Sequence, residues 1–119
     1  CPEDWVGHHN ICYYLSEAEG SWSESQEQCS SLGASLALLT VGSSLSYQEF
    51  LLRLRGNINY WLGVRRQGGR LEWVDGSSFN QRIPVKGEEP CLFLDEKGLR
   101  SSSCSRPQQY ICSKPQAVM

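Results

Sequence analysis

The stretch YWLGVRRQGGRLEWVD, residues 60–75, holds two runs of aromatic and aliphatic residues around a short glycine-rich break. Residues 60–66 and 70–75 have the composition of β-strands. Gln67-Gly68-Gly69 between them has the turn chemistry of a tight β-hairpin, because glycine adopts the positive φ angles that such turns need. We therefore predict a hairpin over this stretch.

Two capping boxes predict two helices. Ser21 and Glu24 open a helix from Trp22 to about Leu32, whose inward stripe would be Trp22, Cys29 and Leu32. Ser46 and Glu49 open a second helix, which ends at Gly56 and carries apolar residues at i, i+3, i+4 and i+7. These residues are Tyr47, Phe50, Leu51 and Leu54.

Short strands are expected before and after the hairpin. One covers residues 11–15, after a turn at 7–10, and another covers residues 34–40, with Leu36 and Leu38 on one face. Residues 76–89 are a polar loop, and strands follow at 91–95 and 109–112, with the Gly98 turn and a serine run at 101–103 between them. This order predicts a single α+β domain over residues 1–119, with the helices segregated from antiparallel sheets.

Composition excludes some classes of protein. The 119 residues suit one domain, and 39% hydrophobic residues with a net charge of -2 describe an ordinary globule without the basic excess that nucleic-acid binding requires. No apolar run approaches the roughly 20 residues that span a bilayer. Since the chain begins at Cys1, we interpret it as part of a longer protein, and any membrane anchor is expected outside it.

The six cysteines favour disulfides over a metal centre. They are widely spaced and none forms a CxxC pair, whereas zinc sites need closely spaced ligands. His8 and His9 are adjacent and are expected as surface turn residues. The sequence alone allows 15 pairings of six cysteines.

The chain resembles the C-type lectin-like domains. The segments that carry the resemblance are Cys1-Pro2-Glu3-Asp4-Trp5 with Cys12-Tyr13-Tyr14, the strand Trp61-Leu62-Gly63-Val64, and Tyr110-Ile111-Cys112. Within that family it is most similar to the natural-killer-cell receptor branch, near the early activation antigen and the lectin-like transcript or osteoclast-inhibitory lectin group. The resemblance implies the disulfides Cys1–Cys12, Cys29–Cys112 and Cys91–Cys104.

The resemblance also makes calcium binding testable in the sequence. Sugar-binding members take carboxylate and amide ligands from a Glu-Pro-Asn or Gln-Pro-Asp tripeptide and from Trp-Asn-Asp, and those positions here are Ile83-Pro84-Val85 and Leu99-Arg100-Ser101. Only Glu89 matches a ligand. Because calcium needs six to eight oxygens, we expect no metal and no cofactor in this chain.

The strand at 91–95 and the turn after it are the candidate protein-binding surface. Alternation predicts Phe93 and Asp95 outward and Leu92 and Leu94 inward, although the opposite register alternates equally well. Similar receptor ligands use this region, and an aromatic anchor among charges is typical of interfaces. The alternative is a solvated turn. The predicted partner-binding residues are Phe93, Asp95, Lys97, Arg100, Arg106 and Arg82. Phe93→Ala or Lys97→Glu is expected to reduce binding and leave the melting temperature nearly unchanged.

The tryptophans and a group of arginines could each be structural or take part in binding. The tryptophans Trp5, Trp22, Trp61 and Trp73 are expected in the core rather than in a sugar-stacking platform. The arginines Arg65, Arg66, Arg70 and Arg82 are expected on a solvated face, with a basic binding rim as the alternative.

The sequence favours a recognition module. Paired cysteines leave no thiolate nucleophile, and no GxSxG elbow accompanies the histidines, so catalysis is not expected. The leading hypothesis is the extracellular domain of a type II membrane protein that binds a protein receptor on another cell without calcium, with a possible homodimer. The alternatives are a calcium-independent glycan-binding lectin and a secreted lectin-like effector.

Overall fold

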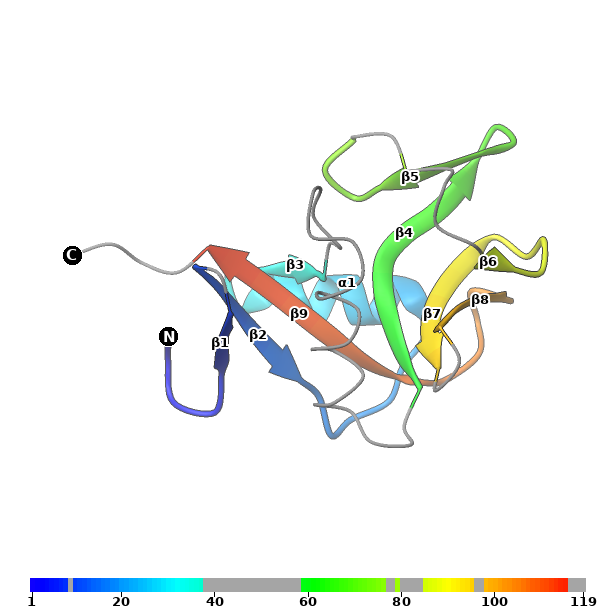
Figure 1. The fold of residues 1–119 in the computed structure, drawn as a ribbon. Coiled ribbons are helices and arrows are strands. Elements are labelled where there is room, and N and C mark those ends of the chain that lie inside the picture. The colour runs from blue at the N-terminus through cyan, green and yellow to red at the C-terminus, as the bar shows by residue number, and fades with distance from the viewer. Residues whose placement is uncertain (9, 38–58, 77–78, 80–84, 96–97, 116–119) are drawn as a thin grey trace.

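Helix α1 (Trp22–Ser31) packs against a mixed sheet of nine short strands in the computed structural model, which describes residues 1–8, 10–37, 59–76, 79, 85–95 and 98–115 (Figure 1). The strands are β1 (Val6–His8), β2 (Ile11–Leu15), β3 (Ser35–Leu36), β4 (Tyr60–Gln67), β5 (Arg70–Trp73), β6 (Val85–Lys86), β7 (Cys91–Asp95), β8 (Gly98–Ser102) and β9 (Gln109–Pro115). The α+β class is confirmed. The predicted second helix lies outside the described residues.

The sheet is mixed: most strand pairs are antiparallel, as expected, and two pairs are parallel. The order is β1-β2-β9-β4-β7-β8-β6, with β3 on β9 and β5 on β4. The β4–β9 and β6–β8 pairs are parallel, and the other pairs are antiparallel. Parallel neighbours need a long connection. β7 and β8 lie between β4 and β9 in the sequence and provide that connection.

The predicted central hairpin is confirmed as β4 and β5. Gly68 and Gly69 turn the chain at φ of 58° and 83°, which explains the glycine pair at this position. Three strands were not predicted. β1 occupies part of the segment expected as a turn, β6 lies in the segment expected as a polar loop, and β8 occupies the Gly98 and serine-run segment. Serine and glycine carry little β-propensity, so only pairing with β7 reveals that strand.

Helix α1 begins at the predicted capping box. The Ser21 hydroxyl accepts from the Glu24 backbone N–H, and the Glu24 carboxylate accepts from the Ser21 N–H at 2.9 Å. The Ser21 backbone N–H, and to a smaller extent the Ser21 side chain, lower the pKa of Glu24, because their hydrogen bonds to the carboxylate favour its ionised form. Trp22 and Cys29 are buried as expected, but Leu32 is 42% exposed, because it lies beyond the last helical residue. No helix in the described part of the chain is long and apolar enough to span a bilayer.

Both faces of the sheet are covered, and each face has its own hydrophobic core. One core, on the α1 side, contains Trp22, Cys29, Leu36, Trp61, Cys91, Phe93, Tyr110 and Cys112. The other contains Tyr13, Ala37, Tyr60, Leu62, Val64, Trp73, Phe79, Leu92, Leu94, Leu99 and Ile111. Three tryptophans are therefore core residues, as expected, whereas Trp5 is only half-buried against Tyr14 and Lys114.

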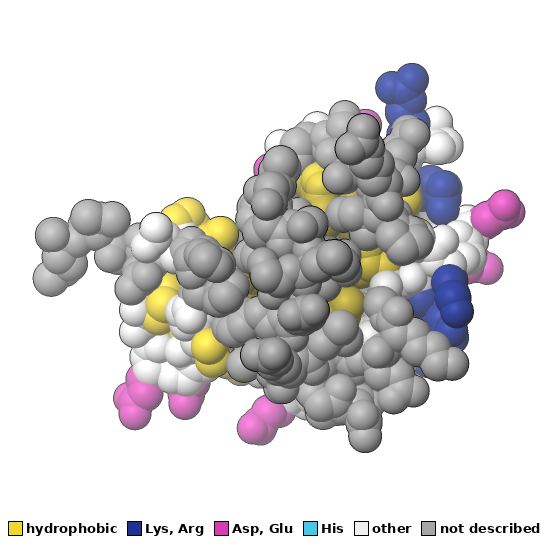
Figure 2. Space-filling model, viewed as in Figure 1, with side chains coloured by type: hydrophobic (Ala, Val, Ile, Leu, Met, Phe, Trp, Pro, Cys, Tyr) yellow, Lys and Arg dark blue, Asp and Glu magenta, His cyan; other side chains and the backbone are white. Residues whose placement is uncertain are grey.

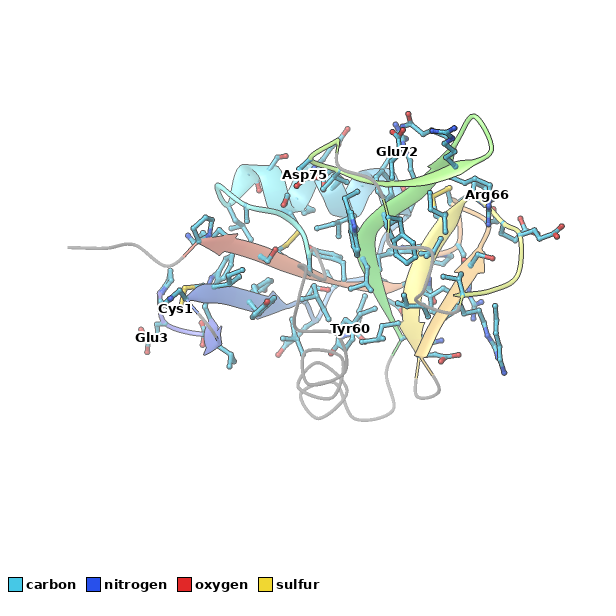
Figure 3. All side chains as sticks on the ribbon, turned by 45° about the horizontal axis from the view of Figure 1, so that its top comes forward. Cys1, Glu3, Tyr60, Arg66, Glu72 and Asp75 are labelled. Atoms are coloured by element: carbon cyan, nitrogen blue, oxygen red, sulfur yellow. A yellow bond between two sulfur atoms is a disulfide. The ribbon has the colours of Figure 1, made fainter. Side chains whose placement is uncertain are left out.

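All three disulfides join the pairs that the family resemblance implied: Cys1–Cys12, Cys29–Cys112 and Cys91–Cys104. Cys29–Cys112 joins α1 to β9 across 83 residues, and a loop of that length gives about 4–5 kcal/mol in the chain-entropy model. In Figure 3, Cys1 and Glu3 lie at one end of the domain, and Arg66 and Glu72 lie at the β4–β5 end.

Hydrogen bonds from both the backbone and a side chain attach the middle of β4 to the start of α1 and to the residue after β3. The Trp22 indole N–H donates to Leu62 O at 2.8 Å, and the Trp61 indole N–H donates to Gly20 O at 2.9 Å. Gly63 donates to Ala37 O and accepts from Val74 N–H, both at 2.8 Å. A Cβ on Gly63 would lie 2.5 Å from Leu36 O, so this position requires glycine.

Replacement of Gly63 by alanine tests this close approach. We expect Gly63→Ala to lower the free energy of unfolding by about 1–3 kcal/mol, the usual cost of overpacking, measured by urea denaturation. Gly20→Ala is the control, because the nearest atoms to its Cβ belong to the movable Glu24 side chain, at 3.3 Å and 3.4 Å. Equal stability of the two variants would contradict the role assigned to Gly63.

Candidate recognition surface

Strand β7, the core of the predicted binding surface, is buried along its whole length. Phe93 is 1% exposed, and Leu92 and Leu94 are 0% exposed. The expectation that Phe93 faces outward is wrong. The alternation exists, but it divides the residues between the two cores, because the face that Phe93 occupies is covered as well as the opposite one.

The Phe93 ring is enclosed by an aromatic ring and a cation. The Trp61 ring meets it edge-on, with ring centroids 6.0 Å apart. The Arg106 guanidinium carbon lies 5.4 Å from the centroid of the Phe93 ring, and Arg106 itself is exposed. Phe93 therefore serves as the base on which an exposed arginine rests.

Arg100 lies beside Phe93 on the neighbouring strand. The two residues are directly paired across β7 and β8, so their side chains share one face of the sheet. The Arg100 Nε is 3.3 Å from the Asp95 carboxylate, with 45% of the Arg100 side chain and 13% of the Asp95 side chain exposed. Asp95 is buried, at 9%, and thus holds the arginine rather than facing outward as expected.

We call Asp95, Arg100 and Arg106 the β7–β8 surface. Four of the six residues predicted for partner binding, these three and Phe93, lie together there. Lys97 and Arg82 lie outside the described residues.

Basic side chains are confined to one part of the sequence. Residues 1–52 hold seven of the 13 acidic residues and no Lys or Arg, and all 11 Lys and Arg residues follow. In Figure 2, Lys and Arg side chains line the side where Figure 1 places the β4–β5 turn, β6 and β8, with some acidic side chains among them, and further acidic side chains lie near β1. The β7–β8 surface belongs to the basic part of the molecule.

The Ser101 side chain links the segments whose positions correspond to calcium ligands in sugar-binding members of the family. The Ser101 hydroxyl accepts from the Glu89 N–H at 2.9 Å and donates to Lys86 O at 3.2 Å. It therefore links β8 to both ends of the turn after β6. Gly87 in that turn has a φ of 94°, and a Cβ there would lie 2.5 Å from the Ser101 oxygen, so glycine is required.

The other calcium positions are spread between core and surface. Leu99 is buried, Val85 is half-buried, and Arg100 and Glu89 are exposed. Residues 83 and 84 lie outside the described part of the chain. Among the residues that the structure describes, no three His, Cys, Asp or Glu side chains are grouped closely enough to hold a metal ion.

The burial of Phe93 reverses the stability expectation for its replacement. We now expect Phe93→Ala to lower the free energy of unfolding by about 3–5 kcal/mol, because it empties a packed site in the α1-side core. Thermal denaturation measures this loss. A melting temperature within a degree of the parent would show that the ring is not packed as described.

Loss of the Ser101 hydroxyl should destabilise the turn after β6. Ser101→Ala leaves the Glu89 N–H and Lys86 O without this partner and is expected to cost about 1–2 kcal/mol in urea denaturation. Ser103→Ala is the matched control: its hydroxyl contacts Ser105 at the surface, and its loss should cost little. A larger loss of unfolding free energy for Ser103→Ala than for Ser101→Ala would contradict the role assigned to the Ser101 hydroxyl.

Comparison with known proteins places the chain in a family. The family model "Lectin C-type domain" matches residues 18–114. Human C-type lectin domain family 2 member B is 33% identical over 96% of this chain and 75% of its own length. Human early activation antigen CD69 is 35% identical over 97% of this chain, and human C-type lectin domain family 2 member D is 36% identical over 96%. The chain spans only 57% and 59% of those two relatives.

A solved structure gives the same fold. The carbohydrate-recognition domain of the mouse scavenger receptor C-type lectin superposes with a TM-score of 0.87, at 21% identity, over 100% of this chain and 99% of that one. The matched family is not a family of enzymes, so the prediction that the chain is not an enzyme is confirmed. The chain belongs to the C-type lectin domain family, as an extracellular domain similar to the family 2 members and early activation antigen CD69.

Proposed function

We propose that this domain is the recognition module of a type II membrane protein, and that it binds a protein receptor on another cell through the β7–β8 surface without calcium. The receptor is expected to be lectin-like itself. Lys97 and Arg82 remain proposed contributors. The observation that carries the proposal is a pair of exposed, restrained arginines: Arg106 rests on the Phe93 ring, and Arg100 is paired with Asp95.

The β7–β8 surface has the properties of a protein-binding surface. Arginine is enriched in protein interfaces, and a side chain fixed before binding loses less conformational entropy when the partner arrives. Arg106 rests on the Phe93 ring and Arg100 is held by Asp95, so both are restrained in the unbound domain. The strands beneath them are buried, which gives the surface a rigid base.

Similarity and cysteine pairing support the cellular location. The relatives include an early activation antigen, and they extend beyond the matched region. No free cysteine occurs among the described residues, and all six cysteines of the sequence are paired. Disulfides persist in oxidising compartments such as the cell surface. A secreted form would satisfy the same observation, and the full-length sequence distinguishes the two.

The proposal includes a homodimer. β1 is the terminal strand in the order of the described sheet, and Val6 on it is 37% exposed. A terminal strand offers unpaired backbone groups to another strand. A twofold pairing of two β1 strands would bury that edge, and it is the simplest symmetric arrangement for two identical chains.

Removal of the two arginines tests the binding surface. Multimers of the domain would be applied to cells that each express one lectin-like receptor, in calcium and in EDTA. Relative to the parent, Arg100→Ala and Arg106→Ala are each expected to reduce binding about tenfold, the effect of a moderate interface hot spot. Binding should be the same with and without calcium.

Arg70→Ala is the matched control, since it removes an exposed arginine from the β5 end of the central hairpin. All variants would first be compared with the parent by melting temperature, so that unfolding is not mistaken for lost contact. Full binding by both surface variants would move the site elsewhere. Binding abolished by EDTA would overturn the metal-free mechanism.

A further inference from the structure

The disulfide Cys1–Cys12 differs from the other two in its surroundings. Cys29–Cys112 and Cys91–Cys104 belong to the α1-side core or pack against it. Cys1 is exposed, and both Cys1 and Cys12 lie outside the two hydrophobic cores. In Figure 3, Cys1 lies at one end of the domain. A thiol in solution can therefore reach this disulfide without opening either core.

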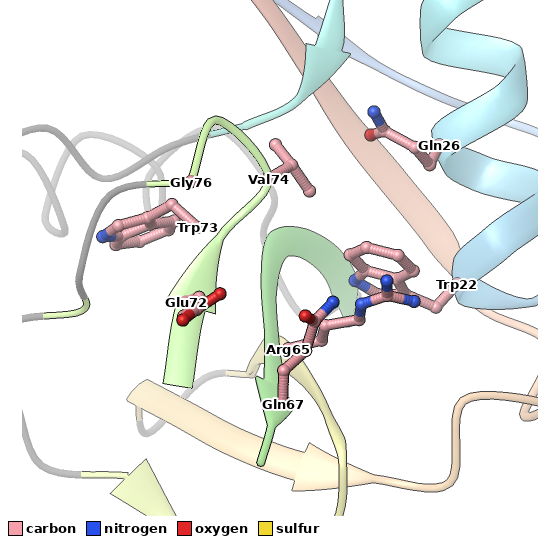
Figure 4. A pocket seen from close by; sticks show the side chains of 8 residues that line it. All are labelled: Trp22, Gln26, Arg65, Gln67, Glu72, Trp73, Val74 and Gly76. Atoms are coloured by element: carbon pink, nitrogen blue, oxygen red, sulfur yellow. The ribbon is translucent and has the colours of Figure 1, made fainter. Parts of the chain in front are cut away.

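A hollow of about 320 Å³ opens beside this disulfide, and we call it the N-terminal hollow. Its lining consists of Cys1, Pro2, Cys12, Lys114 and Pro115. The hollow between α1 and the β4–β5 hairpin, shown in Figure 4, has no cysteine among the described residues that line it. Thiol–disulfide exchange requires access of the attacking thiolate to sulfur, and the N-terminal hollow provides that access to Cys1–Cys12.

Lys114 places a cation beside the disulfide. It is directly paired with Cys12 across β2 and β9, so the two side chains share one face of the sheet. The Lys114 ammonium nitrogen lies 4.6 Å from the centroid of the Trp5 ring, and this contact restrains it. When a thiolate attacks the exposed sulfur of Cys1, Cys12 leaves as a thiolate. Because a nearby ammonium stabilises a thiolate, Lys114 favours attack at Cys1.

The segment that the disulfide closes contains a turn with an uncommon backbone conformation. Asp4 has a φ of 73°, in the left-handed region that few residues other than glycine adopt. The Trp5 N–H donates to Pro2 O at 3.1 Å and closes the turn. Such conformations persist where the surrounding structure enforces them. The disulfide fixes one end of this turn and β1 fixes the other, so reduction frees the turn at one end.

The rest of the domain does not depend on this disulfide. β1 keeps its backbone pairing with β2, which joins Val6 to Tyr13 and Gly7 to Cys12. The Trp5 ring keeps its contact with Tyr14, with ring centroids 5.5 Å apart. Cleavage of Cys1–Cys12 would therefore release residues 1–4 and leave the sheet, both cores and the other two disulfides in place.

We propose that Cys1–Cys12 is a site of reductive cleavage by dithiols, the class of reductant that CxxC oxidoreductases use. One thiolate of the dithiol attacks Cys1 Sγ and forms a mixed disulfide, and Cys12 leaves as a thiolate that takes up a proton. The second thiol of the reductant then attacks the mixed disulfide and releases Cys1 as a thiol. Two electrons and two protons pass from the dithiol, which becomes a disulfide, to the two cysteines.

Cleavage would change how the domain is attached to the membrane. Four released residues extend over at most roughly 14 Å. In a type II protein the chain before Cys1 leads to the membrane, so reduction lengthens the tether by up to that distance. This consequence rests on the proposed function, whereas the selective cleavage does not.

Differential alkylation tests the proposal. The domain would be treated with graded dithiothreitol and then with iodoacetamide, and mass spectrometry would identify the labelled cysteines. Cys1 and Cys12 should be labelled at least about tenfold faster than the other four cysteines. In NMR spectra of the same samples, the indole N–H signals of Trp22 and Trp61 should stay in place, while the amide signals of residues 3–8 move. The full-length protein on cells, labelled with a membrane-impermeant maleimide, should show the same order.

Variants test the cation and separate this site from the β7–β8 surface. Lys114→Gln should slow cleavage about threefold or more and Lys114→Arg should restore it, because the leaving thiolate needs a nearby cation. Lys86→Gln, which removes an exposed lysine from β6, is the control and should leave the rate unchanged. The double variant Cys1→Ser, Cys12→Ser should keep the other two disulfides and bind receptor-expressing cells like the parent. The two proposals therefore fail independently.

Three outcomes would overturn the proposal. They are labelling of all six cysteines at one rate, earlier labelling of Cys91 and Cys104, and movement of the indole signals together with the first labelling, which would show that cleavage requires unfolding. Equal rates for the parent and Lys114→Gln would overturn the assigned direction of attack.

Discussion

The fold depends on the attachment of β4 to the start of helix α1. Two indole N–H groups donate in opposite directions, from Trp22 to Leu62 O and from Trp61 to Gly20 O. Both rings are buried, and a buried indole N–H without a partner would cost about 1–3 kcal/mol, so each bond favours one orientation of its ring. The glycine at position 63 then allows the β4 backbone to approach β3. Helix, central strand and α1-side core are thereby fixed relative to one another.

Burial on both faces of β7 determines what this domain can offer a partner. An aromatic side chain that fills a core cannot also insert into another protein. Phe93 instead supports Arg106 on its ring, and Asp95, two residues along the same face, holds Arg100. Recognition through this surface would rely on positioned charges and their geometry, which contribute to specificity and association rate more than to raw affinity.

The sequence predicted the features that are encoded by neighbouring residues. The capping box at Ser21 and Glu24 and the Gly68-Gly69 turn are local signals, and the structure has both. The burial of Phe93 was not accessible in this way, because an alternating strand shows that two faces differ and does not show whether the second face is covered. β8 was missed because glycine and serine do not indicate a strand in the sequence, and its Gly98, Ser101 and Ser102 become a strand through backbone pairing with β7. The hollow combines α1 with a hairpin about 40 residues later, and no local pattern indicates such proximity.

The two hydrogen bonds of the Ser101 hydroxyl hold the turn after β6 with protein groups alone. A calcium ion would join such segments through carboxylates, which release it when they are protonated or when the free ion becomes scarce. A serine hydroxyl between two backbone groups does neither, because none of the three titrates in the physiological range. The turn that packs beside the β7–β8 surface is therefore held by a contact that is insensitive to calcium and to mild acid.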